Sequence, residues 1–437
     1  MNFKFGIRGL NMSIEISKRA LRQYMIIYIM LIFNQSNLYQ NYIYQNQTLV
    51  SFIAFSMLLI LIVNHKKEAM EGISLVLILL IFTSVLRLLK GGIGLEFWYE
   101  MAVKIEIVYL AILADVKHFM ERFIKVVFFL ALVSVIFWLF QNIGINLAQK
   151  LLYQYSTQGT YTVYDAAWNK TVHRYNGYGI FVYSFLSVYP NRNVGIFTEP
   201  GIYQSVLNMA LFCIVFFANE INLSYKKVVQ MFLVISAALI TTQSTSGYFG
   251  FGALLVVILL RNKKDSLNWK KYAIRLLVVG IIILGVDYFI RGGQSLFETA
   301  ILSKVFNSSN EFSLVAENST GIWRAATFWM AILAMIRYPM GLGVDGWISF
   351  ISNSVYAGPG GWPFKLGAIL GIIPFIISLY WIFKPLKYIR PDYYVIALYV
   401  FLYFNTTVAQ TSAFYPVLIM VPVFLSLYRS HRSVIIN

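Results

Sequence analysis

Long apolar stretches, separated by charged residues or by clusters of Gly, Pro and Asn, follow one another along most of the chain. A helix of about 20 mostly apolar residues is long enough to cross a bilayer. Several of the stretches are shorter, so their helices must extend into the polar residues on either side. The pattern predicts an all-α polytopic membrane protein of about twelve spanning helices. Their cores lie at about 24–33, 49–63, 73–86, 102–114, 124–143, 201–218, 228–242, 247–260, 274–290, 366–383, 393–404 and 414–428.

The composition agrees with a membrane protein and excludes most soluble classes. Of the 437 residues, 59% are hydrophobic and 12% are charged, and the mean hydropathy is +0.68. Soluble domains carry roughly 25% charged residues, and half of that supply cannot cover the surface of a water-soluble protein of this size. A soluble enzyme, a disordered scaffold and a secreted disulfide-rich domain are therefore excluded. Residues 1–437 are predicted to form a single integral membrane domain.

The net charge of +17 arises from 35 Lys and Arg residues against 18 Asp and Glu residues. Nucleic-acid-binding proteins have such an excess, but the cytoplasmic loops of membrane proteins collect Lys and Arg as well. If the N-terminus lies inside, the inner segments hold 23 of the 35 basic residues, although the outer segments contain about twice as many residues. We therefore expect both termini to be cytoplasmic and expect no nucleic acid to bind. The inner segments are then 1–23, 64–72, 115–125, 219–227, 261–275, 384–392 and 429–437.

One further apolar helix, 322–336, is long enough to pass for a thirteenth span. If it crossed, the basic residues of segment 384–392 would move to the outer side, against the positive-inside rule. We therefore predict a helix that does not cross, within one long outer loop at 291–365. The first large outer loop along the chain covers 144–199, and 291–365 is the second. Loops this long seldom lack a use in compact proteins, so the outer face is the predicted active or binding face.

The first candidate segment joins the 144–199 loop to the sixth span and reads RNVGIFTEPGIYQ from Arg192 onward. Pro200 and Gly201 suit a helix start, because proline fixes the backbone angle of the first turn and lacks an amide hydrogen. Glu199 would then lie at the positive end of the helix dipole, which favours its ionised form. Arg192 and Glu199 therefore either form a functional site beside the membrane surface or form a salt-linked helix cap in which Arg192 is an interfacial anchor. The first turn adds two polar candidates, Tyr203 and Gln204.

The second candidate segment is the polar turn TTQSTSGYFGFG between the seventh and eighth spans. Its hydroxyls suit the caps of helix ends, and its glycines permit close helix packing. The same hydroxyls and amides are able to bind a sugar or a phosphate, so both interpretations stay open. The hydroxyl residues are Thr241, Thr242, Ser244, Thr245 and Ser246, and the glycines are Gly247, Gly250 and Gly252.

The third candidate segment runs from Gly321 to Trp347 and begins on the helix that is predicted not to cross. Arg324 is always ionised, and its planar guanidinium can grip phosphate oxygens; the alternative is a solvated helix face. A turn that ends the helix and exposes backbone amides is predicted next, with Asp345 beside it. The residues that predict this turn are Pro339, Gly341 and Gly343.

Charged residues within the predicted spans are costly near lipid. Lys104 and Glu106 fall in the fourth span, and Asp287 and Arg291 fall at the end of the ninth. The two residues of each pair are expected either to form an ion pair with each other or to lie at the aqueous edge of the membrane. The aromatic residues of the first large loop fit sugar stacking and an interfacial belt equally well. They are Tyr153, Tyr155, Tyr161, Tyr164, Trp168, Tyr175 and Tyr178.

Motifs of soluble catalytic sites are absent from the sequence. It contains no HExxH, no Walker-type phosphate loop, no GxSxG elbow and no paired cysteines, so no metal, nucleotide or other cofactor is expected. The single cysteine, Cys213, lies in an apolar run and is expected to be a small residue that faces either lipid or the helix bundle. His173, the one outer histidine, is expected to be solvated.

The three candidate segments, in this order, resemble the O-antigen polymerase and ligase superfamily of bacterial surface-polysaccharide assembly. That family has an Arg before Gly-x-Phe-x-Glu-Pro-Gly, a Thr/Ser-Ser-x-Gly-Tyr turn, and a large outer loop with an Arg, a Trp and Pro-x-x-Gly-x-Gly. The first motif is matched by Arg192, Gly195, Phe197, Glu199, Pro200 and Gly201. The second is matched by Thr245, Ser246, Gly247 and Tyr248, and the third by Arg324, Trp329, Pro339, Gly341 or Leu342, and Gly343.

This resemblance implies a glycosyltransferase at the outer face of a bacterial cytoplasmic membrane. It would join oligosaccharide repeat units carried on polyprenyl pyrophosphate, for O-antigen, capsule or exopolysaccharide synthesis. Arg192 and Arg324 would stabilise the departing pyrophosphate, and Glu199 would either orient Arg192 or accept the proton of the attacking hydroxyl. The expected substrate-binding residues are Tyr203, Gln204, Ser244, Thr245, Ser246 and Asp345. The expected partners are the lipid-linked oligosaccharide, membrane lipid, a flippase and a chain-length regulator.

Two other functions stay open. Ligases of this superfamily typically carry a His-Asn pair upstream of Gly-x-x-x-Gly; Gly367 and Gly371 match the glycines, but residues 351–354 read Ile-Ser-Asn-Ser and contain no histidine. This departure favours a polymerase over a ligase and leaves the general base unassigned. A lipid-linked oligosaccharide flippase would also have about twelve spans, but such transporters usually show two related halves and charged residues along a cavity.

Overall fold

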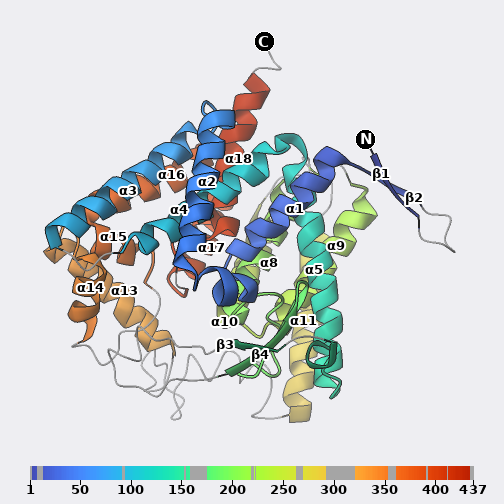
Figure 1. Ribbon diagram of the computed structural model, residues 1–437. Coiled ribbons are helices and arrows are strands. Elements are labelled where there is room, and N and C mark those ends of the chain that lie inside the picture. The colour runs from blue at the N-terminus through green and yellow to red at the C-terminus, as the bar shows by residue number, and fades with distance from the viewer. Residues whose placement is uncertain are drawn as a thin grey trace.

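The computed structural model is predominantly helical, with two small antiparallel sheets (Figure 1). It describes residues 2–6, 13–90, 94–151, 154–157, 175–217, 221, 223–261, 269–291, 320–352, 361–389, 392–410 and 412–433. Within these ranges only the backbone is described for 2–6, 13–16, 154–157, 175–176, 283–284, 291, 320–325 and 429–433.

Each predicted span core except 366–383 lies within a described helix, apart from at most two residues at one end of the core. Several helices extend beyond their cores, and α4 starts seven residues earlier than its core at 102–114. The first half of the chain forms α1 (Lys18–Phe33), α2 (Gln47–His65), α3 (Met70–Lys90), α4 (Leu95–Leu113), α5 (Phe119–Asn142) and α6 (Leu147–Leu151). The middle forms α8 (Pro200–Phe216), α9 (Tyr225–Thr241), α10 (Thr245–Leu260) and α11 (Trp269–Arg291). The last part forms α13 (Thr320–Arg337), α14 (Gly343–Ser352), α15 (Phe364–Leu370), α16 (Ile372–Phe383), α17 (Tyr393–Thr407) and α18 (Pro416–Ser433). Short helical turns connect them at η1 (Tyr39–Ile43), η2 (Val116–His118) and η6 (Lys384–Tyr388).

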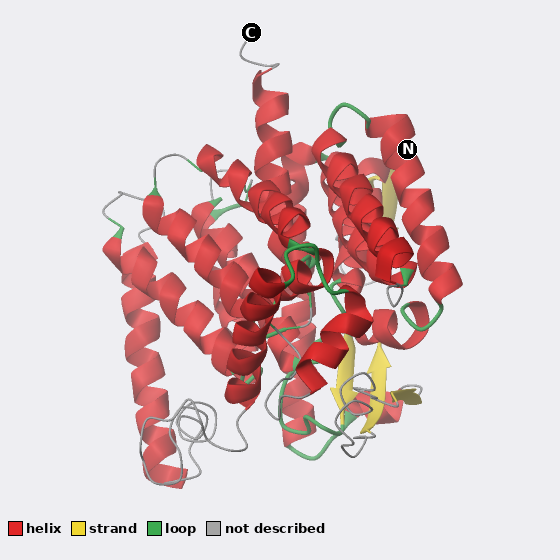
Figure 2. Cartoon of the chain, turned by 90° about the vertical axis from the view of Figure 1, so that its left-hand side faces the viewer, coloured by secondary structure: helices red, strands yellow, loops and turns green. Residues whose placement is uncertain are grey.

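The strands occupy two places in the sequence. β1 (Asn2–Gly6) pairs with β2 (Ser13–Ser17) in an antiparallel hairpin at the start of the chain. A three-stranded antiparallel sheet, ordered β3-β4-β5, lies within the predicted 144–199 loop (Figure 2). Its strands are β3 (Gln154–Thr157), β4 (Tyr175–Ile180) and β5 (Tyr183–Leu186). The helical prediction therefore holds, with these short strands added at the connections.

Four of the described helices are long and apolar enough to cross a membrane. They are Gln47–His65, Met70–Lys90, Val116–Asn142 and Trp269–Ile290. Their large apolar side chains include many exposed ones, such as Phe52, Leu88 and Phe289. Exposed apolar surface on this scale is unfavourable in contact with water and favourable in contact with lipid tails.

Two helices form the centre of the bundle. α8 is apolar on all sides, and it packs against α5, α9, α10, α17 and α18. α4 packs against α1, α2, α3 and α18. A helix that is hydrophobic all round belongs in a protein core or a membrane, which explains why α8 is surrounded. Cys213 lies on α8 and is fully buried, so it faces the bundle, which is one of the two positions expected for it.

The predicted span 366–383 is wrong as a single helix. It is divided into α15 and α16 at Gly371, whose backbone has φ +100° and ψ 170°. Only glycine adopts this region without strain. The turn after α13 occupies the break: the Ile372 amide donates to the Pro339 carbonyl at 2.9 Å, and the Leu342 amide donates to the Ala368 carbonyl at 2.9 Å. The backbone groups freed by the break are therefore paired by a remote segment.

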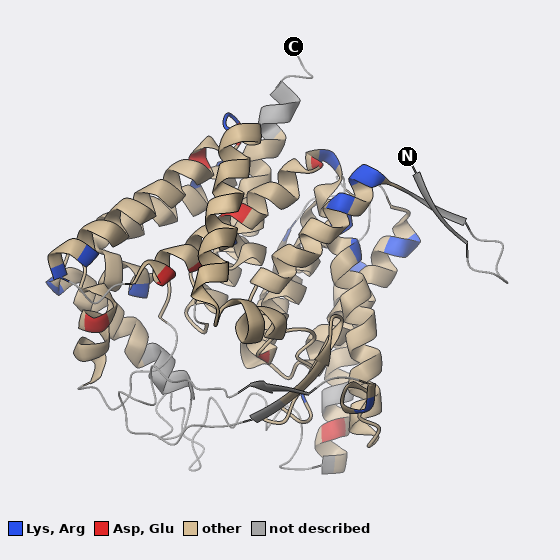
Figure 3. Cartoon of the chain, in the orientation of Figure 1, with Lys and Arg blue, Asp and Glu red and all other residues tan. Residues whose placement is uncertain are grey.

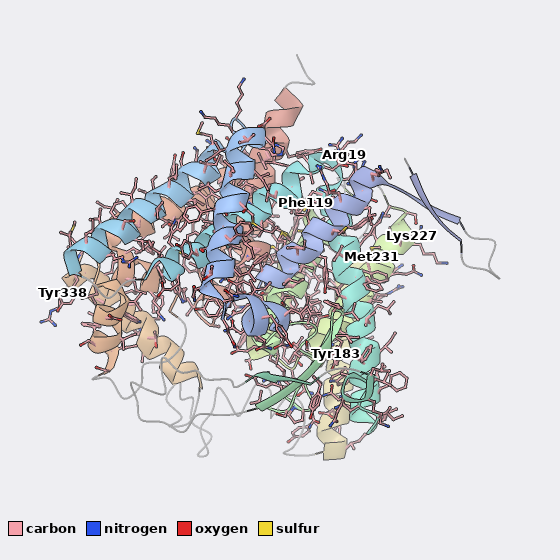
Figure 4. The ribbon with its side chains drawn as sticks, in the orientation of Figure 1. Arg19, Phe119, Tyr183, Lys227, Met231 and Tyr338 are labelled. Carbon is pink, nitrogen blue, oxygen red and sulfur yellow. The ribbon has the colours of Figure 1, made fainter. Side chains whose placement is uncertain are left out.

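Helix ends gather at two opposite ends of the bundle, which we call the upper and lower ends after their places in Figure 1. α1 begins and α18 ends at the upper end, whereas the β3–β5 sheet lies at the lower end. The labelled side chains agree, with Arg19 and Lys227 above and Tyr183 below (Figure 4). Described Lys, Arg, Asp and Glu residues lie mainly at helix ends (Figure 3).

A buried carboxylate organises part of the upper end. Asp115, between α4 and η2, accepts hydrogen bonds from Arg122 at 2.8 Å and from His118 at 3.0 Å, with Arg19 at 3.6 Å. Burial alone would raise the pKa of Asp115. The hydrogen bonds from His118 and Arg122 and the positive charges of Arg122 and Arg19 outweigh burial, and hold this pKa below its ordinary value.

Candidate functional site

The helix start predicted at Pro200 is confirmed. α8 begins at Pro200, and Glu199 occupies the cap position in an extended conformation. The Glu199 side chain is half-buried and makes no capping hydrogen bond to the helix amides. The carboxylate therefore stands at the positive end of α8 without serving as its cap.

Arg192 joins the first candidate segment to the second. Its Nε donates to the Thr242 carbonyl at 3.2 Å, and its terminal NH2 group donates to the Gln243 carbonyl. The guanidinium also lies over the Tyr189 ring at 5.6 Å. Thr242 caps the C-terminal end of α9, where a cation is favoured by the helix dipole. Arg192 thus fixes the two segments together at the lower end.

A second set of contacts strengthens this junction. The Asn193 side chain donates to Thr241 Oγ1 at 2.9 Å and to Ser134 Oγ at 3.0 Å. Gly195 has φ +55°, and a Cβ at this position would lie 2.9 Å from the Tyr203 ring. The Asn193 side chain therefore ties the segment before α8 to α5 and α9, and the close approach of this segment to Tyr203 requires glycine at position 195.

Tyr203 lies in the first turn of α8 and is enclosed by the protein. It is 1% exposed, its hydroxyl bonds to Ser134 Oγ at 2.8 Å, and its ring stacks on Phe197 at 5.5 Å. The enclosed Tyr203 side chain thus packs against the segment that precedes α8. Gln204, the next residue, is buried to the same extent.

Gln204 connects α8 to the polar turn. Its Nε2 donates to the Gly201 carbonyl at 2.9 Å and to Ser246 Oγ at 3.4 Å, while Ser246 Oγ lies 3.2 Å from Ser244 Oγ. Asn405 of α17 donates to the Ser246 carbonyl at 2.8 Å. Gln204 and the two serines therefore form one polar cluster at the lower end, and Thr245 lies between them on the first turn of α10.

The glycines of the turn allow α8 and α10 to approach closely. A Cβ on Gly247 would lie 2.9 Å from Gln204 Cβ, and one on Gly250 would lie 2.7 Å from Asn208 Nδ2. Gly252 has nothing within 4 Å of the same position. The close-packing prediction is therefore confirmed for two glycines and wrong for the third.

The third candidate segment is only partly described. The predicted helix exists as α13, but the side chain of Arg324 lies outside the described residues. Asp345 is exposed in the first turn of α14. The turn amides are not free as predicted, because those of Gly341 and Leu342 donate to the carbonyls of Tyr338 and Ala368. This turn supports the break between α15 and α16.

A path of contacts relates α13 to Glu199. A Cβ on Gly361 would lie 3.2 Å from the Thr327 backbone, so this loop touches α13. The Gly361 amide donates to the Val408 carbonyl at 3.1 Å. Two residues later, Gln410 lies against Gly201, where a Cβ would be 2.1 Å from Gln410 Nε2. The described part of α13 is thus linked to the start of α8 through the end of α17.

The charged residues predicted within the fourth span do not pair with each other. Lys104 instead forms an ion pair with Glu100, one turn earlier, and donates to Ser412 Oγ at 3.2 Å. Glu106 is fully buried, and neither carboxyl oxygen has a hydrogen-bond partner. The spacing of Glu100 and Lys104, four residues apart on a helix, was a usable sequence signal for the true pair.

The connection between α1 and α2 also reaches the candidate site. Ser36 pairs with Phe197 in an isolated β-bridge, and the Gln35 carbonyl accepts from the Thr198 amide at 3.4 Å. Gln35 Oε1 accepts from the Tyr415 hydroxyl at 2.7 Å, and the Lys104 ammonium lies 5.6 Å from the Tyr415 ring centre. No feature of the sequence indicates that this connection, residues 34–46, contacts the segment before α8.

Several predictions lie outside the described residues. They concern His173, the Arg291 side chain and most of the first-loop aromatic residues. Among the described residues, no group of three His, Cys, Asp or Glu side chains could hold a metal ion. Comparison with known proteins finds no matching family model, no similar curated protein and no similar solved structure.

Proposed function

We propose that the chain crosses the cytoplasmic membrane twelve times, with both termini inside and the lower end outside. The positive-inside distribution of Lys and Arg supports this orientation. The broken pair α15 and α16 would count as one crossing, and α13 and α14 as none. The apolar helices α8 and α10 are short, so flanking residues would complete each crossing. The helices packed around α8 and α10 would shield those flanking residues from lipid.

We propose that the protein is a repeat-unit polymerase acting on polyprenyl-pyrophosphate-linked oligosaccharides at this outer face. The observation that carries the proposal is the junction of Arg192, Glu199 and the Ser244–Ser246 turn at one end of the bundle. A cation in the segment before α8, a carboxylate at the cap of α8 and hydroxyls at the start of α10 lie at this end. Such an arrangement suits transfer of a sugar from a pyrophosphate leaving group.

In the proposed reaction, a hydroxyl oxygen of one repeat unit attacks the anomeric carbon of another. The bond from that carbon to the pyrophosphate oxygen breaks, and polyprenyl pyrophosphate leaves with the bonding electrons. Arg192, with Arg324 from α13, would stabilise the negative charge on the leaving group. Glu199 would orient Arg192 or take the proton of the attacking hydroxyl. Gln204, Ser244, Thr245, Ser246 and Asp345 are the proposed sugar-binding residues.

One observation favours a transporter as the second candidate. Transporters often bind substrate at discontinuous helices and place charges within the membrane, and α15–α16 is discontinuous while Lys104 and Glu106 are buried within the bundle. A ligase remains the alternative within the same chemistry.

Reconstitution with lipid-linked repeat units separates these functions. The purified protein in vesicles should produce a ladder of lengthening glycans if it is a polymerase. A single transfer to a foreign acceptor would indicate a ligase, and movement of the lipid without bond formation would indicate a transporter. Arg324→Ala should abolish the ladder while the protein stays in the membrane, and an unchanged ladder would remove Arg324 from the proposed site.

A further inference from the structure

Two helices, α9 and α11, begin with the same short pattern, an aromatic residue followed by two lysines. The residues are Tyr225, Lys226 and Lys227 in α9, and Trp269, Lys270 and Lys271 in α11. Neither of these first turns contains an acidic residue. The helix dipole favours negative charge in a first turn and disfavours positive charge. The lysines therefore do not stabilise the helices that carry them, and their presence needs another explanation.

Contacts between aromatic side chains hold the two helix starts side by side. The Tyr225 hydroxyl donates to the Tyr272 hydroxyl, and the centres of the two rings are 6.1 Å apart. The Trp269 ring lies 5.1 Å from the Phe232 ring of α9. Both pairs of lysines are therefore at the upper end, where Lys227 is labelled in Figure 4. Because Tyr225 is the donor, the Tyr272 hydroxyl keeps its own proton for an acceptor outside the pair.

The basic side chains around this tyrosine pair are open to the surroundings. Arg275 lies three residues after Tyr272, and residues at this spacing are neighbours on a helix surface. Within the described part of the chain, no acidic side chain pairs with the exposed cations, which are Lys226, Lys227, Lys271 and Arg275. Tyr225 is exposed as well. A negatively charged ligand therefore reaches this group from the surface without any rearrangement of the bundle.

Exposed apolar side chains continue both helices beyond the lysines. On α11, Ile274 and Val278 lie three and seven residues after Lys271, which places them on the same helix face. On α9, Leu233 lies seven residues after Lys226. All three apolar side chains are exposed. A soluble anion would leave this apolar surface uncovered, whereas a lipid with a negatively charged headgroup would contact both the cations and the apolar faces.

We propose that the starts of α9 and α11 bind an anionic glycerophospholipid of the cytoplasmic leaflet. The phosphate of the lipid accepts a hydrogen bond from the Tyr272 hydroxyl and lies among the exposed lysines and Arg275. Its acyl chains cover Leu233, Ile274 and Val278. Basic clusters beside spanning helices attract anionic lipid, and each Lys or Arg changes the affinity about fivefold. The site uses the membrane orientation proposed above and is independent of the polymerase chemistry.

Tyr272→Phe is the sharpest variant for testing this site, because it removes one hydroxyl and keeps the net charge. A general attraction between charges predicts no change, whereas loss of a hydrogen bond to the phosphate should weaken binding about tenfold. Lys226→Gln combined with Lys271→Gln should weaken binding about 25-fold, by two factors of about five. The matched control combines Lys18→Gln with Arg22→Gln, which removes two exposed charges from the start of α1 at the same end.

Binding is measured by native mass spectrometry of the full chain in detergent, titrated with phosphatidylglycerol or with phosphatidylcholine of the same acyl chains. We expect the wild type and the α1 control to bind phosphatidylglycerol more tightly, and both site variants to lose affinity by the factors given. The proposal is overturned if the wild type binds the two lipids equally, if Tyr272→Phe binds normally, or if the α1 control loses as much affinity as the lysine double variant. Displacement of the lipid by an equal concentration of glycerol 3-phosphate, which has no acyl chains, would also overturn it.

Tyr225→Phe separates a lost binding site from a disturbed helix pair. It removes the bond between the two tyrosines but keeps the Tyr272 hydroxyl, so it should retain phosphatidylglycerol binding. Equal losses of affinity in the two tyrosine variants would overturn the proposal. Both ends of the protein are accessible to lipid in detergent, so these results depend neither on the membrane orientation nor on the formation of a glycan ladder.

Discussion

The break between α15 and α16 depends on one glycine, and its replacement is the most direct test of the fold at the lower end. Gly371 has φ +100°, and a Cβ there would lie 2.8 Å from the Pro339 carbonyl oxygen and 3.0 Å from the Met340 carbonyl carbon. The backbone conformation alone costs a residue other than glycine about 1–3 kcal/mol. Forcing extra atoms into a packed site adds about 1–3 kcal/mol. We therefore expect Gly371→Ala to lower the free energy of unfolding by about 2–6 kcal/mol.

Two controls separate the causes. Gly144 also has positive φ, +86°, but nothing lies within 4 Å of its Cβ position, so Gly144→Ala should cost only about 1–2 kcal/mol. Gly285 lies within α11 with open space around it, so Gly285→Ala should stabilise by about 0.5–1 kcal/mol.

The assay uses the single cysteine of the chain. Cys213 is buried in α8, so a thiol-reactive fluorophore reports its exposure when the bundle unfolds on heating in detergent. A loss for Gly371→Ala no greater than that for Gly144→Ala would refute the close contact between the α13–α14 turn and the helix break.

Three further predictions concern the site, the upper end and the topology. Arg192→Ala should abolish the glycan ladder and Arg192→Lys should retain part of it, because the charge remains; a normal ladder from Arg192→Ala would contradict the proposed role. Asp115→Asn should cost about 2–3 kcal/mol at pH 7, between the values for exposed and buried ion pairs. Because the pKa of Asp115 is lowered, its contribution is present above about pH 4 and is lost as the pH falls through the folded-state pKa. Melting curves of the two proteins should therefore converge in acid, and a constant difference down to pH 3 would contradict the pairing. Asn142→Cys and Asp345→Cys should react with an impermeant maleimide from outside and Lys67→Cys should not; a silent Asp345→Cys would mean that α13 crosses.

Much of the secondary structure could be predicted because helix formation depends on local sequence. The apolar stretches located the helices, and Pro200 located the start of α8. Gly247 and Gly250 predicted a close contact between helices, but the sequence did not indicate which helix would be the partner. The distribution of Lys and Arg predicted which segments face the cytoplasm, because this prediction depends on the order of the basic segments along the chain and not on packing.

Contacts between remote segments could not be predicted. The hydrogen bond from Lys104 to Ser412, 308 residues away, has no signal in the local sequence, whereas the ion pair of Lys104 with Glu100, four residues away, does. The enclosure of Tyr203 likewise involves Ser134, 69 residues away, whose Oγ bonds the Tyr203 hydroxyl. Both of these neighbours lie far away in the sequence.

The sequence by itself determined that this is a helical protein of membrane-like composition, with three polar segments set against an apolar background. These properties are local or additive, so composition and periodicity record them directly. Only the tertiary structure decided that Arg192 binds the end of α9 and that the α13–α14 turn fills the break at Gly371. Each of these depends on which helices pack together, and that choice is made by the complementary shapes and unpaired polar groups of the whole bundle.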